Sequence, residues 1–155
     1  MVVKYKYLSI LIYKVIILVA LTFLQSCSSG KKDQLDYVER DLHSIYETAL
    51  NNLIKKNYKQ ASLEFDEVER QHPYSDWSKK AILMSSYASY KDKDFIKTET
   101  NLSRYINLYP ASKLTAYAQY LLAMNHFAQI IDVGRDQTAV INAIETFKLI
   151  LDRYP

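Results

Sequence analysis

The only thiol of the chain is that of Cys27, and its setting suits the covalent attachment of lipid. Two lysines near the start precede an apolar core at residues 15–23, and LQS at residues 24–26 leads directly into the cysteine. This order is typical of a secretory signal peptide. A small residue just before the cysteine is typical of a bacterial lipobox, where the thiol takes a diacylglyceryl group and the chain is cut before it. We therefore predict a signal peptide over residues 1–26, an acylated Cys27 and a lipidated tether over residues 27–34.

Two other interpretations of this segment stay open, namely a membrane-spanning anchor and an ordinary signal peptide with a chance cysteine. A span needs about 20 apolar residues, whereas the apolar stretch after Lys14 ends by residue 24. A lone cysteine also has no disulfide partner to explain it, which favours the lipobox. Because Ser28 follows the cysteine where Asp would favour retention in the inner membrane, we expect export to the outer membrane.

The rest of the chain carries no catalytic or metal-binding pattern. Its histidines, His43, His72 and His126, form no HExxH pair, and there is no second cysteine for a metal site. No GxSxG motif occurs, and two glycines are too few for a glycine-rich phosphate loop. Removing residues 1–26 takes away three lysines and no acidic residue, so the formal net charge falls from +3 to zero. We therefore expect no enzyme, no nucleic-acid partner and no cofactor besides the lipid on Cys27.

Apolar residues recur at spacings of three and four along most of the remaining chain, as they do on one face of an α-helix. The low Gly and Pro content agrees with an all-helical protein. The acidic run between residues 64 and 69 is expected to be a solvated helix face. Six helices are predicted, at about residues 35–56, 57–73, 76–90, 94–110, 112–127 and 136–155, with N-caps at Asn57, Asp76, Asp94, Ser112 and Asp136.

The three prolines end three of these helices at intervals of 37 and 45 residues. A period in this range indicates a helical repeat, whose units must stack because none buries its apolar face alone. The third pair carries the extra residues around positions 131–138. We predict an all-α, tetratricopeptide-like solenoid of three antiparallel helix pairs, at about residues 35–73, 76–110 and 112–155. The two small residues and the large apolar residue typical of each unit are Ala49, Ala61 and Phe65; Ser86, Thr98 and Leu102; and Ala123, Ala143 and Phe147.

Several segments in a fixed order resemble one family: the lipobox cysteine, residues 46–90, RYINLYPAS at residues 104–112, and GRDQT at residues 134–138 before AIETFKLILDRYP. Together they resemble the BamD-type family of outer membrane protein assembly factors, over essentially the whole chain after the signal. The resemblance implies a lipid-anchored scaffold on the periplasmic face of the outer membrane. It also implies work with a BamA-type barrel protein and other assembly lipoproteins on unfolded β-barrel precursors, whose C-terminal targeting strand the N-terminal repeats would receive.

Members of that family usually carry more than three repeats. The chain is therefore expected to be a C-terminally truncated member, with apolar surface exposed on its last helix pair. An alternative interpretation keeps the binding role but assigns it to a lipidated repeat pilotin or another cell-envelope adaptor. The GRDQT segment and the 37-residue first interval favour the assembly factor.

The first helix of each pair is expected to line the concave face of the solenoid, and these helices are rich in tyrosine. A tyrosine ring offers a large contact area at low entropic cost, and its hydroxyl can bond to backbone groups. An extended, aromatic-rich peptide is the expected ligand, while packing between helices is the competing role for the same residues. The candidates are Tyr46, Leu50, Leu53, Leu83, Tyr87, Tyr90, Tyr117, Tyr120, Met124 and Phe127.

The GRDQT segment is the second candidate contact. Gly134 suits a helix C-terminus, and Asp136 suits the N-cap that follows. Arg135 and Gln137 have no such local role. Arg135 and Gln137 are therefore candidate contacts for a partner protein.

Overall fold

The computed structural model describes Lys14, residues 38–130 and residues 137–154. The chain divides into two compact units, Met1–Asp33 and Gln34–Pro155, and all the helices named below belong to the second. The predicted signal peptide and tether, with Cys27, lie outside the described residues, as do residues 134–136.

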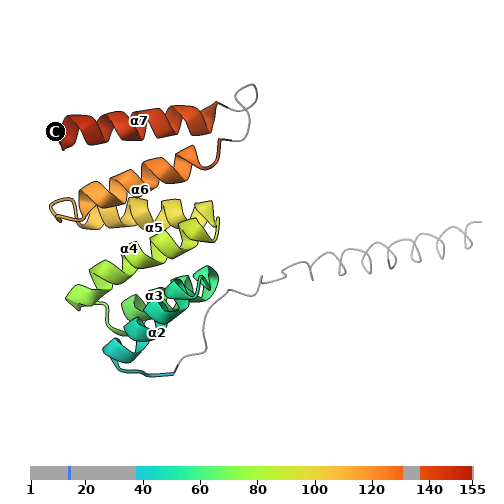
Figure 1. Cartoon of the computed structure of the whole chain (residues 1–155), viewed down its shortest axis with the longest axis vertical. Coiled ribbons are helices and arrows are strands. Elements are labelled where there is room, and N and C mark those ends of the chain that lie inside the picture. The colour runs from blue at the N-terminus through green and yellow to red at the C-terminus, as the bar shows by residue number, and fades with distance from the viewer. Residues whose placement is uncertain (1–13, 15–37, 131–136, 155) are drawn as a thin grey trace, which may run out of the picture. The chain divides into compact units, whose positions relative to one another are not determined.

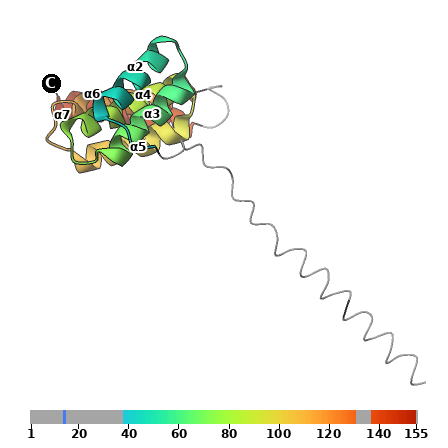
Figure 2. The ribbon, with the colours of Figure 1, turned by 90° about the horizontal axis from the view of Figure 1, so that it is seen from below.

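Six α-helices make up the described part of the second unit, and that part contains no strand. They stack in chain order, with α2 at one end and α7 at the other (Figure 1), and most of them overlap when viewed from below (Figure 2). Each helix packs chiefly on its neighbours in the chain, and α4 also contacts α6. This arrangement confirms the prediction of an all-α fold of stacked helix pairs. The helices are α2 (Leu42–Ile54), α3 (Tyr58–Gln71), α4 (Asp76–Lys91), α5 (Phe95–Leu108), α6 (Thr115–Phe127) and α7 (Thr138–Arg153).

The small residues that defined the repeat lie where helices cross. Two of them are polar, and each hydroxyl donates to a backbone carbonyl one turn earlier at 2.8 Å, Ser86 to Ile82 and Thr98 to Asp94. These hydroxyls therefore occupy the same kind of position as an alanine without leaving a buried donor unpaired. All six small residues are buried: Ala49, Ala61, Ser86, Thr98, Ala123 and Ala143.

Two apolar cores hold the stack together, and α4 contributes to both. The first core joins α2, α3 and α4 around the fully buried Phe65, with Ala81 and Ala88 supplied by α4. The second joins α4, α5 and α6 around Tyr105, with Ile82 and Leu83 supplied by α4. Because α4 is covered on two sides, eight of its 16 residues are buried.

The first predicted helix begins later than expected, at Leu42 instead of residue 35. The Asp41 side chain accepts hydrogen bonds from the backbone N–H groups of His43 and Ser44, which makes it the N-cap. The preceding segment is held to the end of α3: Arg40 N–H donates to the Gln71 side-chain oxygen at 2.9 Å, and the Gln71 amide donates to the Val38 carbonyl at 2.7 Å. These bonds keep residues 38–40 out of the helix.

Of the other predicted N-caps, Asp94 is confirmed, because its carboxylate accepts from the Lys97 N–H at 3.1 Å. The prediction for Asp76 is wrong by one residue, since Ser75 caps α4. The prediction for Ser112 is also wrong, since α6 begins only at Thr115. The Ser112 hydroxyl accepts from the Leu114 N–H at 3.2 Å in the turn before the helix, and it lies 3.0 Å from the Tyr105 hydroxyl of α5.

In the first two helix pairs, the turns that join the two helices have similar backbone geometry, with Lys56 and Lys93 at φ of 63° and 65°. These two lysines are 37 residues apart, which is the interval between the first two prolines. In each turn the next residue donates back to the helix, Asn57 to Asn52 and Asp94 to Ser89, both at 2.9 Å. The Asn57 side chain makes no cap hydrogen bond, although Asn57 occupies the predicted N-cap position.

The last helix, α7, packs chiefly on α6 and buries only one residue, Ala143. Phe147, the equivalent of the fully buried Phe65, is only half-buried. The exposed apolar residues of α7 include Ile144 and Leu151, with 48% and 72% of their surface accessible. The expected exposure of apolar surface on the third pair is therefore present on α7.

Candidate functional site

Three tyrosines from α4 and α6 form what we call the tyrosine cluster: Tyr87, Tyr117 and Tyr120. The rings of Tyr117 and Tyr120 lie 6.5 Å apart, and about half of each side chain is exposed. Burial raises the pKa of Tyr117 above its usual value, and the nearby hydroxyls of Tyr87 and Tyr120 raise it further. The Tyr117 phenol is therefore neutral at physiological pH and can donate a hydrogen bond to a ligand.

A second group of rings joins α2 to the start of α4. The Trp77 ring meets Tyr46 edge-on at 4.8 Å and His43 at 5.5 Å, while the Lys80 ammonium lies 4.9 Å from its centre. Tyr46 also packs edge-on against Phe65 at 5.3 Å, and burial raises the pKa of the Tyr46 hydroxyl. Sequence reasoning missed Trp77, although it is the only tryptophan and lies six residues before Leu83 on the same helix.

The other groove candidates divide between surface and core. Leu83 lies in the second core with 4% of its surface exposed, so its side chain does not face a groove. Leu50 and Leu53 pack against the first core, and Tyr90 packs against the second. Met124 is half-buried, while Phe127 is 57% exposed. The exposed aromatic surface among the candidates is thus concentrated on α6.

The acidic run on α3 was expected to be a solvated face, and this prediction is wrong for half of it. Glu64 and Glu67 are buried, with 6% and 4% of their surface exposed. An Arg40 guanidinium nitrogen lies 2.7 Å from Glu64, and the Arg70 Nε–H donates to Glu67 at 2.7 Å. Burial by itself would raise the pKa of Glu67, but hydrogen bonds from Arg70 and Gln71 outweigh it and hold that pKa below its usual value.

The other two acidic residues of the run, Asp66 and Glu69, connect α3 to α5. The Lys97 ammonium lies 2.6 Å from the Asp66 carboxylate, and Arg104 makes a two-pronged contact with Glu69. The hydrogen bonds that Arg104 donates to the Glu69 carboxylate raise the pKa of the Arg104 guanidinium. These pairs tie together the second helices of two successive repeats, so the acidic run is part of the scaffold and not a separate site.

The second candidate contact is only partly within the described residues. Gln137 is exposed and occupies the N-cap position of α7, and its side chain makes no cap hydrogen bond. Its backbone carbonyl accepts from the Ile141 N–H at 2.9 Å. The Gln137 side chain is therefore accessible, and its role and that of Arg135 stay predictions.

No helix within residues 38–130 and 137–154 is long and apolar enough to cross a bilayer. In the same ranges, no three His, Cys, Asp or Glu side chains gather in a group that could hold a metal ion. Two of the three histidines have evident structural surroundings: the His72 ring nitrogen lies 3.1 Å from the Arg40 carbonyl, and His126 is buried on α6.

Relatives with established names match most of this chain. One relative, from Caulobacter vibrioides, is named outer membrane protein assembly factor BamD. It is 40% identical over 139 residues, which is 90% of this chain and 46% of the relative. Proteins of the same name from Rickettsia prowazekii and Pasteurella multocida are 33% and 27% identical over 85% and 88% of this chain, and 52% and 56% of their own lengths. The chain thus spans about half the length of the curated relatives it matches.

A family model agrees with these similarities. It is described as outer membrane lipoprotein, YfiO, and it matches residues 38–155, which include all six described helices. The match therefore covers both aromatic groups and the ion pairs between α3 and α5. The chain belongs to the YfiO family of outer membrane lipoproteins.

Proposed function

We propose that this chain acts as an outer-membrane lipoprotein scaffold of the β-barrel assembly machinery, helping to fold and insert β-barrel proteins. The observation that carries the proposal is the family match over residues 38–155, joined to relatives named as outer membrane protein assembly factors. The role is one of binding and not of catalysis. Stacked helix pairs with exposed aromatic surface suit such a role, because they offer an extended surface to another protein.

The scaffold is held at the periplasmic face of the outer membrane by acyl chains on Cys27. Two or more chains give stable anchoring, whereas one chain binds a membrane only marginally. This anchor keeps the helical repeats close to the bilayer into which the barrels insert. The expected partners are a BamA-type barrel protein and other assembly lipoproteins, with Arg135 and Gln137 as candidate contacts.

The ligand of the tyrosine cluster is the C-terminal targeting strand of an unfolded β-barrel precursor. Tyr117 and Tyr120 present half-exposed rings from successive turns of α6, next to Tyr87 of α4. Such rings can pack against the aromatic side chains of an extended strand, and their hydroxyls can bond to its backbone. The position of the cluster between two repeats suits a ligand that crosses several helices.

Purification of the lipidated chain from envelopes in detergent, with identification of the co-eluting proteins, tests the scaffold. Recovery of the BamA-type barrel protein is the expected result. Recovery of a secretin instead would favour the pilotin, and recovery of no envelope partner would contradict the scaffold role.

A separate measurement tests the tyrosine cluster. We expect replacement of both Tyr117 and Tyr120 by Ala to weaken binding of a peptide with the C-terminal sequence of a β-barrel protein by about 30-fold, which corresponds to about 2 kcal/mol. Tyr74→Ala is the matched control, since Tyr74 is fully exposed at the turn before α4. Equal binding by the double variant and the control would refute the assignment of the cluster.

A further inference from the structure

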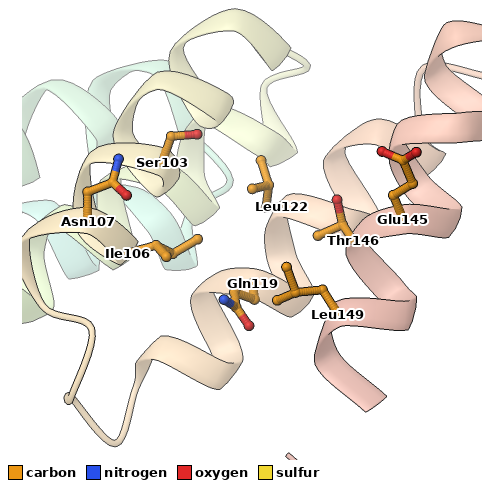
Figure 3. A pocket seen from close by; sticks show the side chains of 8 residues that line it. All are labelled: Ser103, Ile106, Asn107, Gln119, Leu122, Glu145, Thr146 and Leu149. Atoms are coloured by element: carbon orange, nitrogen blue, oxygen red, sulfur yellow. The ribbon is translucent and has the colours of Figure 1, made fainter. Parts of the chain in front are cut away.

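A cleft between α5, α6 and α7 lies apart from the tyrosine cluster. Its volume is about 370 Å³, and Figure 3 shows side chains of all three helices around it. Gln119 and Leu122 line it from α6. At 3.6 residues per turn, these two residues lie on the opposite side of α6 from Tyr117 and Tyr120. The cleft is therefore a second surface, which the proposed function does not use.

The walls of the cleft are apolar, and one aliphatic side chain comes from each helix: Ile106 of α5, Leu122 of α6 and Leu149 of α7. Such walls favour a ligand that carries an aliphatic stem, because burial of methylene groups is favourable by about 0.8 kcal/mol each. The polar groups that line the cleft then indicate which functional group the ligand must carry at the end of that stem.

Gln119 supplies a buried acceptor at this cleft. Only 4% of the residue is exposed, and its side-chain oxygen accepts no hydrogen bond from the described residues. A buried amide oxygen without a donor costs about 1–3 kcal/mol. Rotation of the amide about its last side-chain bond can turn this oxygen toward the cleft, so a ligand that brings a donor recovers that energy.

The two neighbouring polar groups of α7 are acceptors as well. The Thr146 hydroxyl donates its proton to the Asn142 carbonyl at 2.7 Å, which leaves its oxygen as an acceptor. Among the described residues, Glu145 is the one charged side chain that lines the cleft, and its carboxylate has only acceptor oxygens. The Ser103 hydroxyl and the Asn107 amide, on the α5 side, can each accept as well. Lys148 and Arg153 border an adjoining depression, but the Arg153 guanidinium lies over the Tyr154 ring at 6.0 Å.

We propose that this cleft binds an arginine side chain of a partner protein. The aliphatic stem lies between Ile106, Leu122 and Leu149, and the guanidinium donates to Gln119, Glu145 and Thr146. Arginine fits better than lysine, because the planar guanidinium carries five N–H donors and can meet several acceptors at once. The site is one of docking and involves no chemical step.

The test is a nuclear magnetic resonance titration of the whole chain in detergent micelles with N-acetylarginine methylamide. The control ligand is N-acetylcitrulline methylamide, which keeps the length and shape of arginine but has no charge. We expect saturable shifts of the backbone amides of Ser103, Gln119 and Thr146 with the arginine ligand, and binding about 10-fold weaker with citrulline. Absence of saturable shifts at these amides, or equal binding of the two ligands, would overturn the proposal.

A matched pair of variants separates a local effect from a general one. Glu145→Gln keeps the size of the exposed side chain but removes its charge, and we expect about 10-fold weaker arginine binding. Glu99→Gln makes the same change at an exposed glutamate of α5 that does not line the cleft. Equal affinities of these two variants for arginine would also overturn the proposal, since the carboxylate at the cleft would then play no part.

Discussion

Phe65 is the best position at which to test how the repeats hold together. Its side chain is fully buried in the first core, where Ala49 and Ala61 pack with it, and its ring meets Tyr46 edge-on at 5.3 Å. Replacement of a buried Phe by Ala typically costs about 3–5 kcal/mol, since it removes apolar burial and leaves a cavity. About 0.5–1.5 kcal/mol of that loss is the aromatic contact with Tyr46. We therefore expect Phe65→Ala to lower the free energy of unfolding by about 3–5 kcal/mol.

Phe147 provides the internal comparison, because it holds the equivalent place in the third repeat. The sequence pattern treats the two residues alike and predicts the same large loss for both. The structure distinguishes them, since Phe65 is fully buried whereas Phe147 on α7 is only partly buried. Because part of its ring stays in contact with water, we expect Phe147→Ala to cost less than Phe65→Ala, by about 1 kcal/mol.

The assay is urea denaturation followed by far-ultraviolet circular dichroism, with the stability change taken from the shift of the midpoint at a constant slope. Tyr74→Ala, at a fully exposed residue, should stay within about 0.5 kcal/mol of the parent chain. If Phe65→Ala does not fold, Phe65→Leu replaces it, with an expected loss of about 1–2 kcal/mol. Equal losses at Phe65 and Phe147 would refute the argument that burial between three helices decides the cost.

Three further predictions concern the turns, the buried carboxylate and the anchor. Lys56→Gly and Lys93→Gly should each raise the free energy of unfolding by about 0.5–1 kcal/mol, because glycine adopts positive φ without steric cost; a lower urea midpoint would contradict this. The pKa of Glu67 is lowered in the folded chain, so its stabilising effect is present above the unfolded pKa of about 4.3 and is lost as the pH falls through the folded value. Thermal melts below pH 5 should therefore show a shallower loss of stability for Glu67→Gln than for the parent chain, and parallel curves would count against a stabilising ion pair. Cys27→Ser should release the chain from sedimented membranes, and continued sedimentation with them would exclude the lipid anchor.

The repeat could be predicted from sequence because its signals are local. A small residue at each helix crossing and a proline after each second helix recur at nearly constant spacing, and all six small residues are buried as expected. The cap at Asp94 is equally local, since the carboxylate bonds to a backbone N–H three residues later. Helix starts were less predictable: α2 begins at Leu42 because of bonds between Arg40 and Gln71, which are 31 residues apart.

The candidate site shows the same division between local and distant causes. Periodicity placed Tyr117 and Tyr120 on one face of a helix, and both are exposed. Periodicity could not show that Leu83 is buried in the second core or that the Trp77 ring packs against Tyr46, because both contacts involve a neighbouring helix. The pattern places Leu83 on α4 and the tyrosines on α6 at equivalent positions. Whether each side chain is buried depends on which neighbouring helix covers it.

By itself, the sequence determined an all-α chain of helix pairs, because helix periodicity, turn residues and repeat spacing act over a few tens of residues. Its ordered motifs carried the resemblance to the family. Only the tertiary structure decided which cations pair with the carboxylates of α3. There Glu69 pairs with Arg104 of α5, and Glu64 pairs with Arg40 of the segment before α2. A carboxylate can be buried only where a cation and hydrogen-bond donors reach it, and for Glu64 and Glu69 the cations come from segments outside α3. Their proximity is a property of the stack and not of any one segment.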